Sequence, residues 1–244
     1  MVLLLIWAGL AIIVATMARL AARRLIVDVW PAYLFALPLA GRVLALGQTV
    51  SRQEIASLQQ LTLVLQQVAG IAFFALIVAL FTVRSSTTGE RATRVQATVA
   101  LLGTFLLNAA AFVPTDSSTS TNILVASSAL VISGTLFASW SLAALGRCFG
   151  ILPEVRGFVL RGPYRLVRHP VYLGEIVAAA GILLVKPHPL TLAVLVSLVG
   201  LQYWRTLFEE RALVAVFPTE YPSYRASVPR LIPRLPTHQP LLAD

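Results

Sequence analysis

The sequence predicts an all-α fold, a polytopic transmembrane helical bundle with about seven spans. Of the 244 residues, 58% are hydrophobic and only 12% are charged, which is about half the charged fraction of a typical soluble domain. The mean hydropathy is +0.83. The few charges cluster between long uncharged stretches, a distribution typical of a multi-pass membrane protein.

Seven apolar segments divide the chain, and most approach the ~20 residues that a helix needs to cross a bilayer. They cover approximately residues 2–18, 25–46, 55–83, 95–113, 122–145, 171–185 and 190–208. The second is the weakest, because four polar or helix-breaking residues interrupt it, namely Asp28, Pro31, Pro38 and Arg42. That segment either spans the bilayer or is re-entrant. The sixth is short, and it either crosses with little tilt or pairs with the seventh as a tight hairpin.

The basic residues predict which side each loop faces, because cytoplasmic loops carry the excess of Lys and Arg. With seven spans and an external amino terminus, sixteen of the nineteen basic residues fall on the cytoplasmic side. The outer side keeps Arg42, Arg52 and Lys186. This bias explains the net charge of +9, so we expect no nucleic-acid partner. We expect a multi-pass protein of a bacterial inner membrane, with its first segment retained as an anchor.

The chain divides into two functional parts. Residues 1–121 are predicted to form a transmembrane scaffold. Residues 122–244 are predicted to form the core that holds the site, with the last three spans, a structured loop and the C-terminal tail. This second part contains nearly every polar residue that membrane topology does not explain.

A loop rich in glycine, proline and arginine precedes the sixth segment. It reads RCFGILPEVRGFVLRGPYRLVRHP and ends at Pro170. Its arginines would suit anionic lipid headgroups at the membrane surface. Because proline fits the first turn of a helix, we expect the sixth helix to begin at Pro170 and to point its positive end toward the loop. Arg168 and His169 flank that end, an arrangement suited to an anion such as a carboxylate.

Tyr172 and Gly174 follow in the first turns of this predicted helix. A glycine there allows a close approach to the backbone. The approaching group is either a ligand or another helix, and the sequence leaves both interpretations open.

A second polar cluster closes the seventh segment and reads QYWRTLFEER over residues 202–211. Arg205 and Glu209 are four residues apart and share a helix face. Glu209 and Glu210 adjoin a long apolar run, where carboxylates are costly unless they are paired or functional. The alternative is a helix end that enters the cytosol, with two adjacent aromatic side chains as interfacial anchors.

These motifs resemble the isoprenylcysteine carboxyl methyltransferase family, whose wider group includes membrane phospholipid N-methyltransferases. The pattern RHPxYxG is complete from Arg168 to Gly174. The pair Glu209-Glu210 and the downstream pair Glu220-Tyr221 follow in the family's order and spacing. The resemblance covers approximately residues 138–236.

The resemblance implies an integral membrane methyltransferase that uses S-adenosylmethionine to methylate a lipophilic acceptor, by O-methylation of the isoprenylcysteine type. The cofactor pocket would face the cytoplasm, between the last two helices, the preceding loop and the C-terminal tail. The catalytic residues would be Arg205 and Glu209. The cofactor-binding residues would be Tyr164, Arg168, His169, Pro170, Tyr172, Gly174, Glu210 and Tyr221. The partners would be a lipophilic small molecule or lipid and the membrane lipids, with no metal.

The sequence departs from the family's pattern at two places. Residues 218–221 read PTEY where the family has a stretch similar to Gly-Glu-Glu-Tyr. The helix before the loop offers only Arg147 where isoprenylcysteine enzymes place a basic residue for the substrate carboxylate. A carboxylate acceptor needs no base, whereas an amine or hydroxyl acceptor would need Glu209 to remove its proton. Two alternatives stay open: a phospholipid N-methyltransferase, and a sterol-type membrane reductase that uses NADPH.

Overall fold

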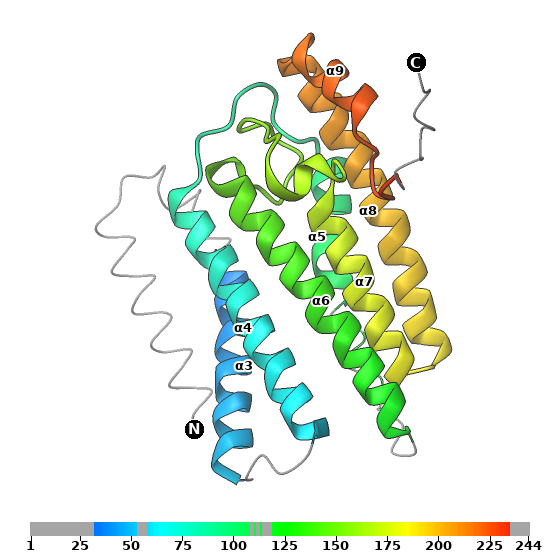
Figure 1. Ribbon diagram of the computed structural model, residues 1–244. Coiled ribbons are helices and arrows are strands. Elements are labelled where there is room, and N and C mark those ends of the chain that lie inside the picture. The colour runs from blue at the N-terminus through cyan, green and yellow to red at the C-terminus, as the bar shows by residue number, and fades with distance from the viewer. Residues whose placement is uncertain (1–31, 53–57, 108–109, 111–112, 114–118, 235–244) are drawn as a thin grey trace, which may run out of the picture.

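The computed structural model describes residues 32–52, 58–107, 110, 113 and 119–234, and within them the fold is all-helical, as predicted (Figure 1). The α-helices are, in order, α3 (Ala32–Arg52), α4 (Leu58–Val83), α5 (Arg94–Phe105), α6 (Thr121–Leu145), α7 (Pro170–Val185), α8 (Pro189–Val216) and α9 (Glu220–Ser227). Two short 3-10 helices, η2 (Gly146–Cys148) and η3 (Gly162–Arg165), lie in the loop before α7. The first predicted segment and its basic residues lie outside the described residues.

Four of the described helices are long and apolar enough to cross a membrane. They are α3, α4, α6 and α8, whose apolar stretches cover 20 to 28 residues, and they confirm a polytopic membrane bundle. The shorter α7 is also apolar and has 16 residues. The count of seven spans stays a prediction.

The predicted helix boundaries are right in some places and wrong in others. The sixth predicted segment begins at Pro170, as expected from the preference of proline for a first helical turn. α3 runs without interruption through Pro38. The fourth predicted segment ends too late, because α5 stops at Phe105. The seventh ends too early, because α8 continues to Val216 and keeps the polar cluster on the helix.

α6 and α7 pack closely because small residues face each other. A Cβ atom on Gly174 would lie 2.6 Å from the carbonyl oxygen of Gly134, and one on Gly181 would lie 2.8 Å from the carbonyl oxygen of Ser127. The Ser127 hydroxyl donates a hydrogen bond to the Gly181 carbonyl at 2.7 Å. Small residues of this kind let membrane helices approach closely. Gly174 therefore serves helix packing, one of the two roles that its sequence position allowed.

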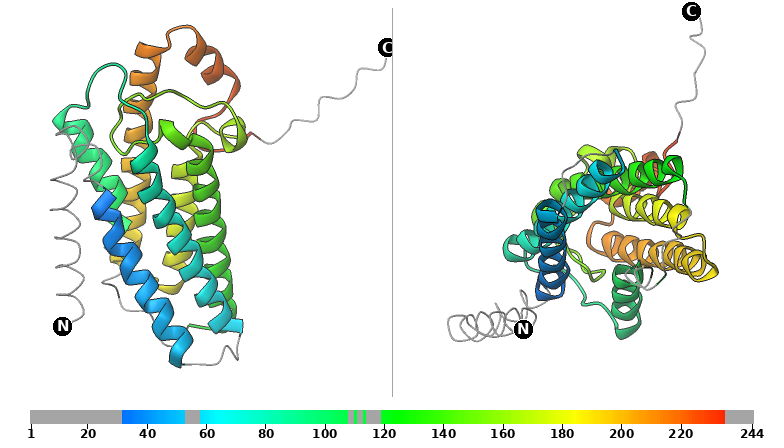
Figure 2. Two further views of the ribbon diagram at one scale, coloured as in Figure 1. Left: turned by 90° about the vertical axis from the view of Figure 1, so that its left-hand side faces the viewer. Right: turned by 90° about the horizontal axis from the view of Figure 1, so that it is seen from below.

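The polar loops meet at one end of the bundle, where α9 also lies (Figure 2). The backbone N–H of Thr88 donates to the carbonyl of Val155 at 2.7 Å, and that of Arg168 donates to the carbonyl of Pro229 at 2.8 Å. At the opposite end, the Lys186 ammonium donates to the carbonyl of Val113 at 2.6 Å. The described loops that were predicted to share one side therefore lie at the same end, with Lys186 at the other. The prediction that Arg42 lies on the outer side is wrong, because Arg42 is in the middle of α3.

An aromatic cluster joins the amino-terminal helices to the loop before α7. Phe35 of α3 stacks on Phe81 of α4 with ring centroids 5.8 Å apart, and Phe81 meets Phe149 of the loop edge-on at 5.2 Å. These contacts hold the predicted scaffold against the predicted core. They fix the loop next to α4, where it forms one wall of the candidate site.

We predict that the end with α9 faces the cytoplasm. Single cysteines would replace Ser223 in α9 and Ser120 before α6, in a Cys148→Ser background. An impermeant thiol reagent added to intact cells should label position 120 and spare position 223, which should react only after permeabilisation. Labelling of position 223 from outside would contradict this orientation.

Candidate active site

A cavity of about 150 Å³ lies at the loop end of the bundle, between the loop, α7, α8 and α9. Seven of the ten predicted site residues line it: Tyr164, Arg168, His169, Tyr172, Arg205, Glu209 and Tyr221. The fold thus gathers residues that are up to 57 positions apart, from Tyr164 to Tyr221, around one space. The other three, Pro170, Gly174 and Glu210, are among the described residues but do not line it.

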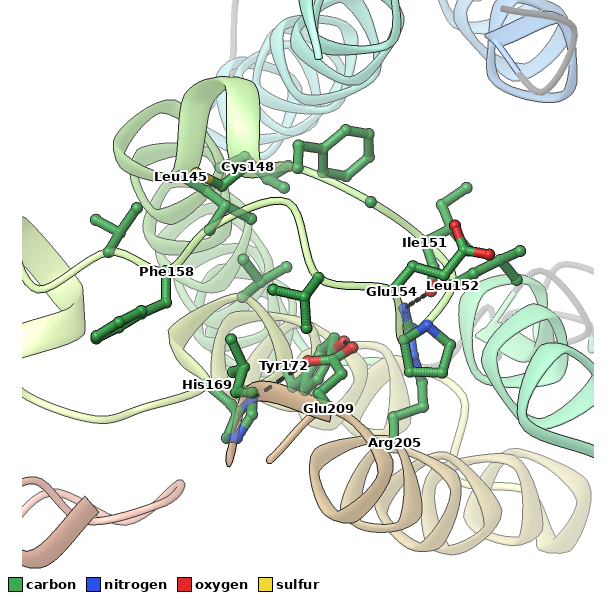
Figure 3. A pocket seen from close by; sticks show the side chains of 18 of the residues that line it. Leu145, Cys148, Ile151, Leu152, Glu154, Phe158, His169, Tyr172, Arg205 and Glu209 are labelled. Carbon is green, nitrogen blue, oxygen red and sulfur yellow. Dashed lines mark hydrogen bonds and ion pairs between the residues drawn. The ribbon is translucent and has the colours of Figure 1, made fainter. Parts of the chain in front are cut away.

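A compact cluster from α7 and α8 forms the floor of this cavity (Figure 3). The His169 and Tyr172 rings are stacked, with centroids 5.7 Å apart and planes 5° from parallel. The Tyr172 hydroxyl donates a hydrogen bond to Glu209. His169 Nδ1 lies 3.5 Å from the second Glu209 oxygen. Glu209 keeps 22% of its side chain exposed, so this carboxylate can meet a ligand.

Arg205 lies beside this cluster, with its guanidinium carbon 4.7 Å from the centroid of the Tyr172 ring. Its Nη2 donates to the Ile151 carbonyl at 2.9 Å, and its Nη1 donates to the Thr104 hydroxyl at 3.2 Å. Its Nε is buried and has no hydrogen-bond partner in the described part of the chain. An unpaired buried donor costs about 1–3 kcal/mol. Arg205 is therefore fixed by these hydrogen bonds, and its Nε–H can still donate a hydrogen bond to a ligand.

Arg205 and Glu209 share a helix face, as predicted, but no ion pair within 4.0 Å joins them among the described residues. Both instead contact Tyr172, Arg205 through the ring and Glu209 through the hydroxyl. The two charges are thus oriented separately, which suits different roles in one site.

Glu210 holds the C-terminal tail in place and does not face the cavity. Its side chain is only 3% exposed. Its oxygens accept hydrogen bonds from Arg168 Nε at 3.0 Å and from Arg230 Nη2 at 2.8 Å, and His169 Nε2 lies 3.2 Å away. We call Glu210, Arg168, His169 and Arg230 the tail clamp. Its cations compensate a carboxylate that would otherwise be costly to bury.

Arg168 extends the tail clamp along the tail. Its Nη1 donates to the carbonyls of Arg225 at 2.8 Å and Val228 at 2.6 Å. The backbone N–H groups of Arg168 and His169 donate to the carbonyls of Pro229 and Arg230. The donors that the sequence suggested for a ligand anion therefore bind the protein's own tail.

Aromatic side chains from the loop and α9 cover the cavity. Phe158 meets Tyr221 edge-on at 5.8 Å and Phe217 at 4.8 Å. The Tyr224 hydroxyl donates to the Tyr164 carbonyl at 2.6 Å. Burial raises the pKa of Tyr164 and of Tyr221, and it raises the pKa of Tyr224 to about 12. These phenols are therefore neutral at physiological pH.

Glu175 is a site residue that the sequence analysis missed. It lies on α7 and accepts a hydrogen bond from Gln202 of α8, whose Oε1 in turn accepts from Arg205 Nη1 at 3.3 Å. A carboxylate inside an apolar helix is costly and marks a functional position by default. That signal was present in the sequence, directly after Gly174.

A second, larger cavity of about 480 Å³ lies among α3, α4, α5, α6 and α7. Five residues line both cavities: Phe35, Phe73, Ile77, Thr104 and Glu175. The two spaces therefore adjoin near Arg205, which donates to Thr104. One lies toward the loop end and the other among the membrane helices.

The site can be compared with known families once this geometry is established. Residues 122–220 match the phospholipid methyltransferase family. This match confirms the resemblance to the membrane methyltransferase superfamily, which includes the isoprenylcysteine enzymes. The matched residues, 122–220, comprise α6, the loop, α7 and α8, which carry the polar residues of the cavity floor. No curated protein matched the chain.

The family match supports the general conclusion that the protein is a membrane methyltransferase. The tail residues of the clamp, such as Arg230, lie beyond the match, as do the amino-terminal helices that line much of the larger cavity. The larger cavity is therefore lined both by matched residues and by residues outside the match.

We predict that the stability of the protein falls as the pH rises above 6.5. Burial alone would lower the pKa of His169, but the hydrogen bonds and charges of Glu209 and Glu210 raise it overall above the ordinary 6.5. Since the folded-state pKa is raised, the stabilisation is present below 6.5 and is lost as the pH passes through the higher value. The melting temperature in detergent should fall by roughly 2–4 °C per 1 kcal/mol lost.

His169→Gln should flatten this pH profile. The matched control is His188→Gln, at the opposite end of the bundle, where His188 caps α8 by accepting from the Leu190 N–H at 3.1 Å. This variant should keep the wild-type slope. If the melting temperatures of wild type and His169→Gln changed with pH in parallel, the loss of stability would not come from deprotonation of His169 in the tail clamp.

Proposed function

We propose that the protein is an S-adenosylmethionine-dependent methyltransferase that acts on a lipophilic acceptor at the cytoplasmic side of the membrane. The observation that carries the proposal is that Arg205, Tyr172 and Glu209 line the smaller cavity together. Arg205 also donates to Thr104, which lines both cavities. The smaller cavity, at the loop end, would hold the water-soluble donor, and the larger cavity, among the membrane helices, would hold the membrane-soluble acceptor. The phospholipid methyltransferase match supports methyl transfer over the NADPH-dependent reductase.

The residues around the smaller cavity fit the cofactor. Aromatic faces such as Phe158 and Tyr221 suit an adenine ring, since flat π systems pack well in offset or edge-to-face geometry. The partly exposed Glu209 carboxylate suits the cationic sulfonium. When bound, S-adenosylmethionine supplies a methyl group, which a lone pair of the acceptor takes as the carbon–sulfur bond breaks and its electron pair stays on sulfur.

The chain's own residues would then orient the reactants and exclude water. Arg205 has a planar guanidinium whose position is fixed by Ile151 and Thr104, so it can orient an acceptor oxygen. Holding reactants in near-attack geometry is a large part of catalysis for such a displacement. The roof of Tyr221 and Phe158 keeps water from the reacting atoms.

Proton removal would depend on the acceptor. A carboxylate carries its lone pair already, whereas an amine or hydroxyl must lose a proton. Two carboxylates are suitably placed: Glu209 on the cavity floor and Glu175 at the junction of the two cavities. O-methylation of the isoprenylcysteine type is the first candidate, and N-methylation of a phospholipid is the second, favoured by the family match.

The proposal predicts a specific ligand and a specific product. S-adenosylhomocysteine should raise the melting temperature of the purified protein in detergent, and NADPH should not. With methyl-labelled S-adenosylmethionine and a membrane lipid extract, label should enter the organic phase. A methyl ester would be released by mild alkali, whereas an N-methyl group would resist it. If NADPH stabilised the protein and S-adenosylhomocysteine did not, the methyltransferase proposal would be wrong and the reductase would be favoured.

Arg205 and Glu209 should affect different steps. Glu209→Gln removes the charge beside the sulfonium, so calorimetry should show at least a tenfold loss of donor affinity, about 1.4 kcal/mol. Arg205→Lys keeps the charge but loses the planar fork, so the single-turnover rate should fall about a hundredfold, or about 2.7 kcal/mol of barrier, with near-normal donor affinity. Arg211→Lys, exposed on the same helix, is the control. Small, equal effects of both variants on affinity and rate would remove these residues from the mechanism.

A further inference from the structure

Arg42 is a cation placed in the middle of a membrane helix. α3 has 21 residues, Ala32–Arg52, and Arg42 is its central one. At 1.5 Å per residue it lies about 15 Å from either end, which is half the thickness of a ~30 Å hydrocarbon layer. An arginine side chain cannot reach the interface from there. Such charges are expensive and mark ligand or ion sites by default.

The neighbouring helix is shaped to receive this side chain. A Cβ atom on Gly70 of α4 would lie 2.6 Å from Arg42 Nη1, so a side chain at position 70 would require the guanidinium to shift. The Arg42 guanidinium carbon lies 5.4 Å from the centroid of the Phe74 ring. Arg42 has no hydrogen bond or ion pair with any of the residues that the structure describes. An aromatic face offers only a weak counterpart to a full charge.

Arg42 lines the 480 Å³ cavity and is itself exposed. Several other polar groups of the lining already have partners. Gln66 donates to the Ser128 hydroxyl at 2.7 Å. The Lys186 ammonium donates to the carbonyls of Ala110 and Val113. Glu175, at the other side of the cavity, accepts from Gln202. Lys186 and Arg42 are the two cations of the described lining. Lys186 is held by carbonyl oxygens, whereas Arg42 has no hydrogen-bond or ion-pair partner there.

We propose that this cavity binds an amphiphile that places an acid group, a carboxylate or phosphate, against Arg42 and lays its apolar body along the cavity wall. Arginine binds both groups through two parallel hydrogen bonds, and the apolar surroundings strengthen the attraction. The wall is largely apolar, with residues such as Leu63, Val131 and Ile182. A free inorganic anion would gain the charge contact but would leave this wall empty.

The acid group would be separate from the methylated atom. Arg42 does not line the smaller cavity beside Glu209, so an acid at Arg42 would identify the acceptor while another part of it reached Arg205. That the amphiphile is the methyl acceptor rests on the proposed function, whereas its binding at Arg42 does not. Arg42 would then be a specificity-determining residue outside the matched family segment.

Matched twelve-carbon probes test the acid group directly. The full-length protein in a neutral maltoside detergent at pH 7.5 is equilibrated with labelled laurate, dodecyl phosphate or dodecanol. We expect the wild type to bind both acids at least tenfold more tightly than the alcohol. Arg42→Gln should abolish this preference by weakening acid binding alone. Inorganic phosphate and acetate should not displace laurate. Equal binding of laurate and dodecanol to the wild type, or an unchanged preference in Arg42→Gln, would overturn the proposal.

A pair of glycine variants keeps the test valid if Arg42→Gln fails to fold. Gly70→Ala leaves Arg42 in the chain but should displace its guanidinium and weaken laurate binding. Gly41→Ala, on α3 beside Arg42, meets nothing within 4 Å and should bind laurate as the wild type does. Equal laurate affinity in these two variants would contradict the proposal.

Binding of S-adenosylhomocysteine in the same samples separates the two proposals. It should be unchanged in Arg42→Gln, since Arg42 is not in the smaller cavity. Acid binding that depends on Arg42, without any S-adenosylhomocysteine binding, would keep the anion site and refute the methyltransferase. The reverse result would keep the methyltransferase and refute the anion site.

Discussion

The loop end of the molecule depends on the ion pairs and hydrogen bonds that surround the buried carboxylate of Glu210. Arg168, His169 and Arg230 converge on it from the start of α7 and from the tail. Removing one partner of a buried charge cluster costs about 3–5 kcal/mol, because it leaves the other charges uncompensated. The clamp thereby fixes three things at once: the path of the tail, the position of the α9 aromatic roof, and the orientation of the His169 ring. Without it, the smaller cavity would have neither cover nor a defined floor.

From this clamp a continuous series of contacts runs toward the membrane. His169 stacks on Tyr172, Tyr172 meets Arg205 and Glu209, and Arg205 connects through Gln202 to Glu175. Each polar group is satisfied mostly by the next, as is required where water is scarce. The tail and the larger cavity are therefore parts of one network, although they lie in different surroundings. On the proposed function, this network orients an acceptor between a donor side and a lipid side.

Local rules predicted the fold class and much of the site, but not the partners of individual charges. Pro170 marked the start of α7 through its fixed φ and missing N–H, and apolar length marked the spans. The RHPxYxG motif pointed to the cavity floor. The role of Glu210 was not accessible, because Arg230 is 20 residues away and its contact depends on how the tail folds back. Glu175 and Arg42 carried a readable signal, a charge within an apolar segment. Arg42 was taken as an interruption of a span, and its fit against Gly70 depends on the pairing of α3 with α4.

The tail clamp also constrains how the smaller cavity could be reached. Its roof, Tyr221 and Phe158, is held by packing and by the same tail that Glu210 fastens. A polar donor entering from the loop end must therefore loosen contacts between the tail and α7, or pass beside them. The clamp is built from charge pairs and backbone hydrogen bonds, whereas the roof packs through aromatic contacts. α6 and α7, by contrast, are locked by Gly134 and Gly174, where a single added methyl group would strike backbone. The fold thus joins a tightly packed pair of membrane helices to a cover that is fastened by charge pairs. On the proposed function, a soluble donor would meet this cover from the loop end, and a lipophilic acceptor would lie within the bundle.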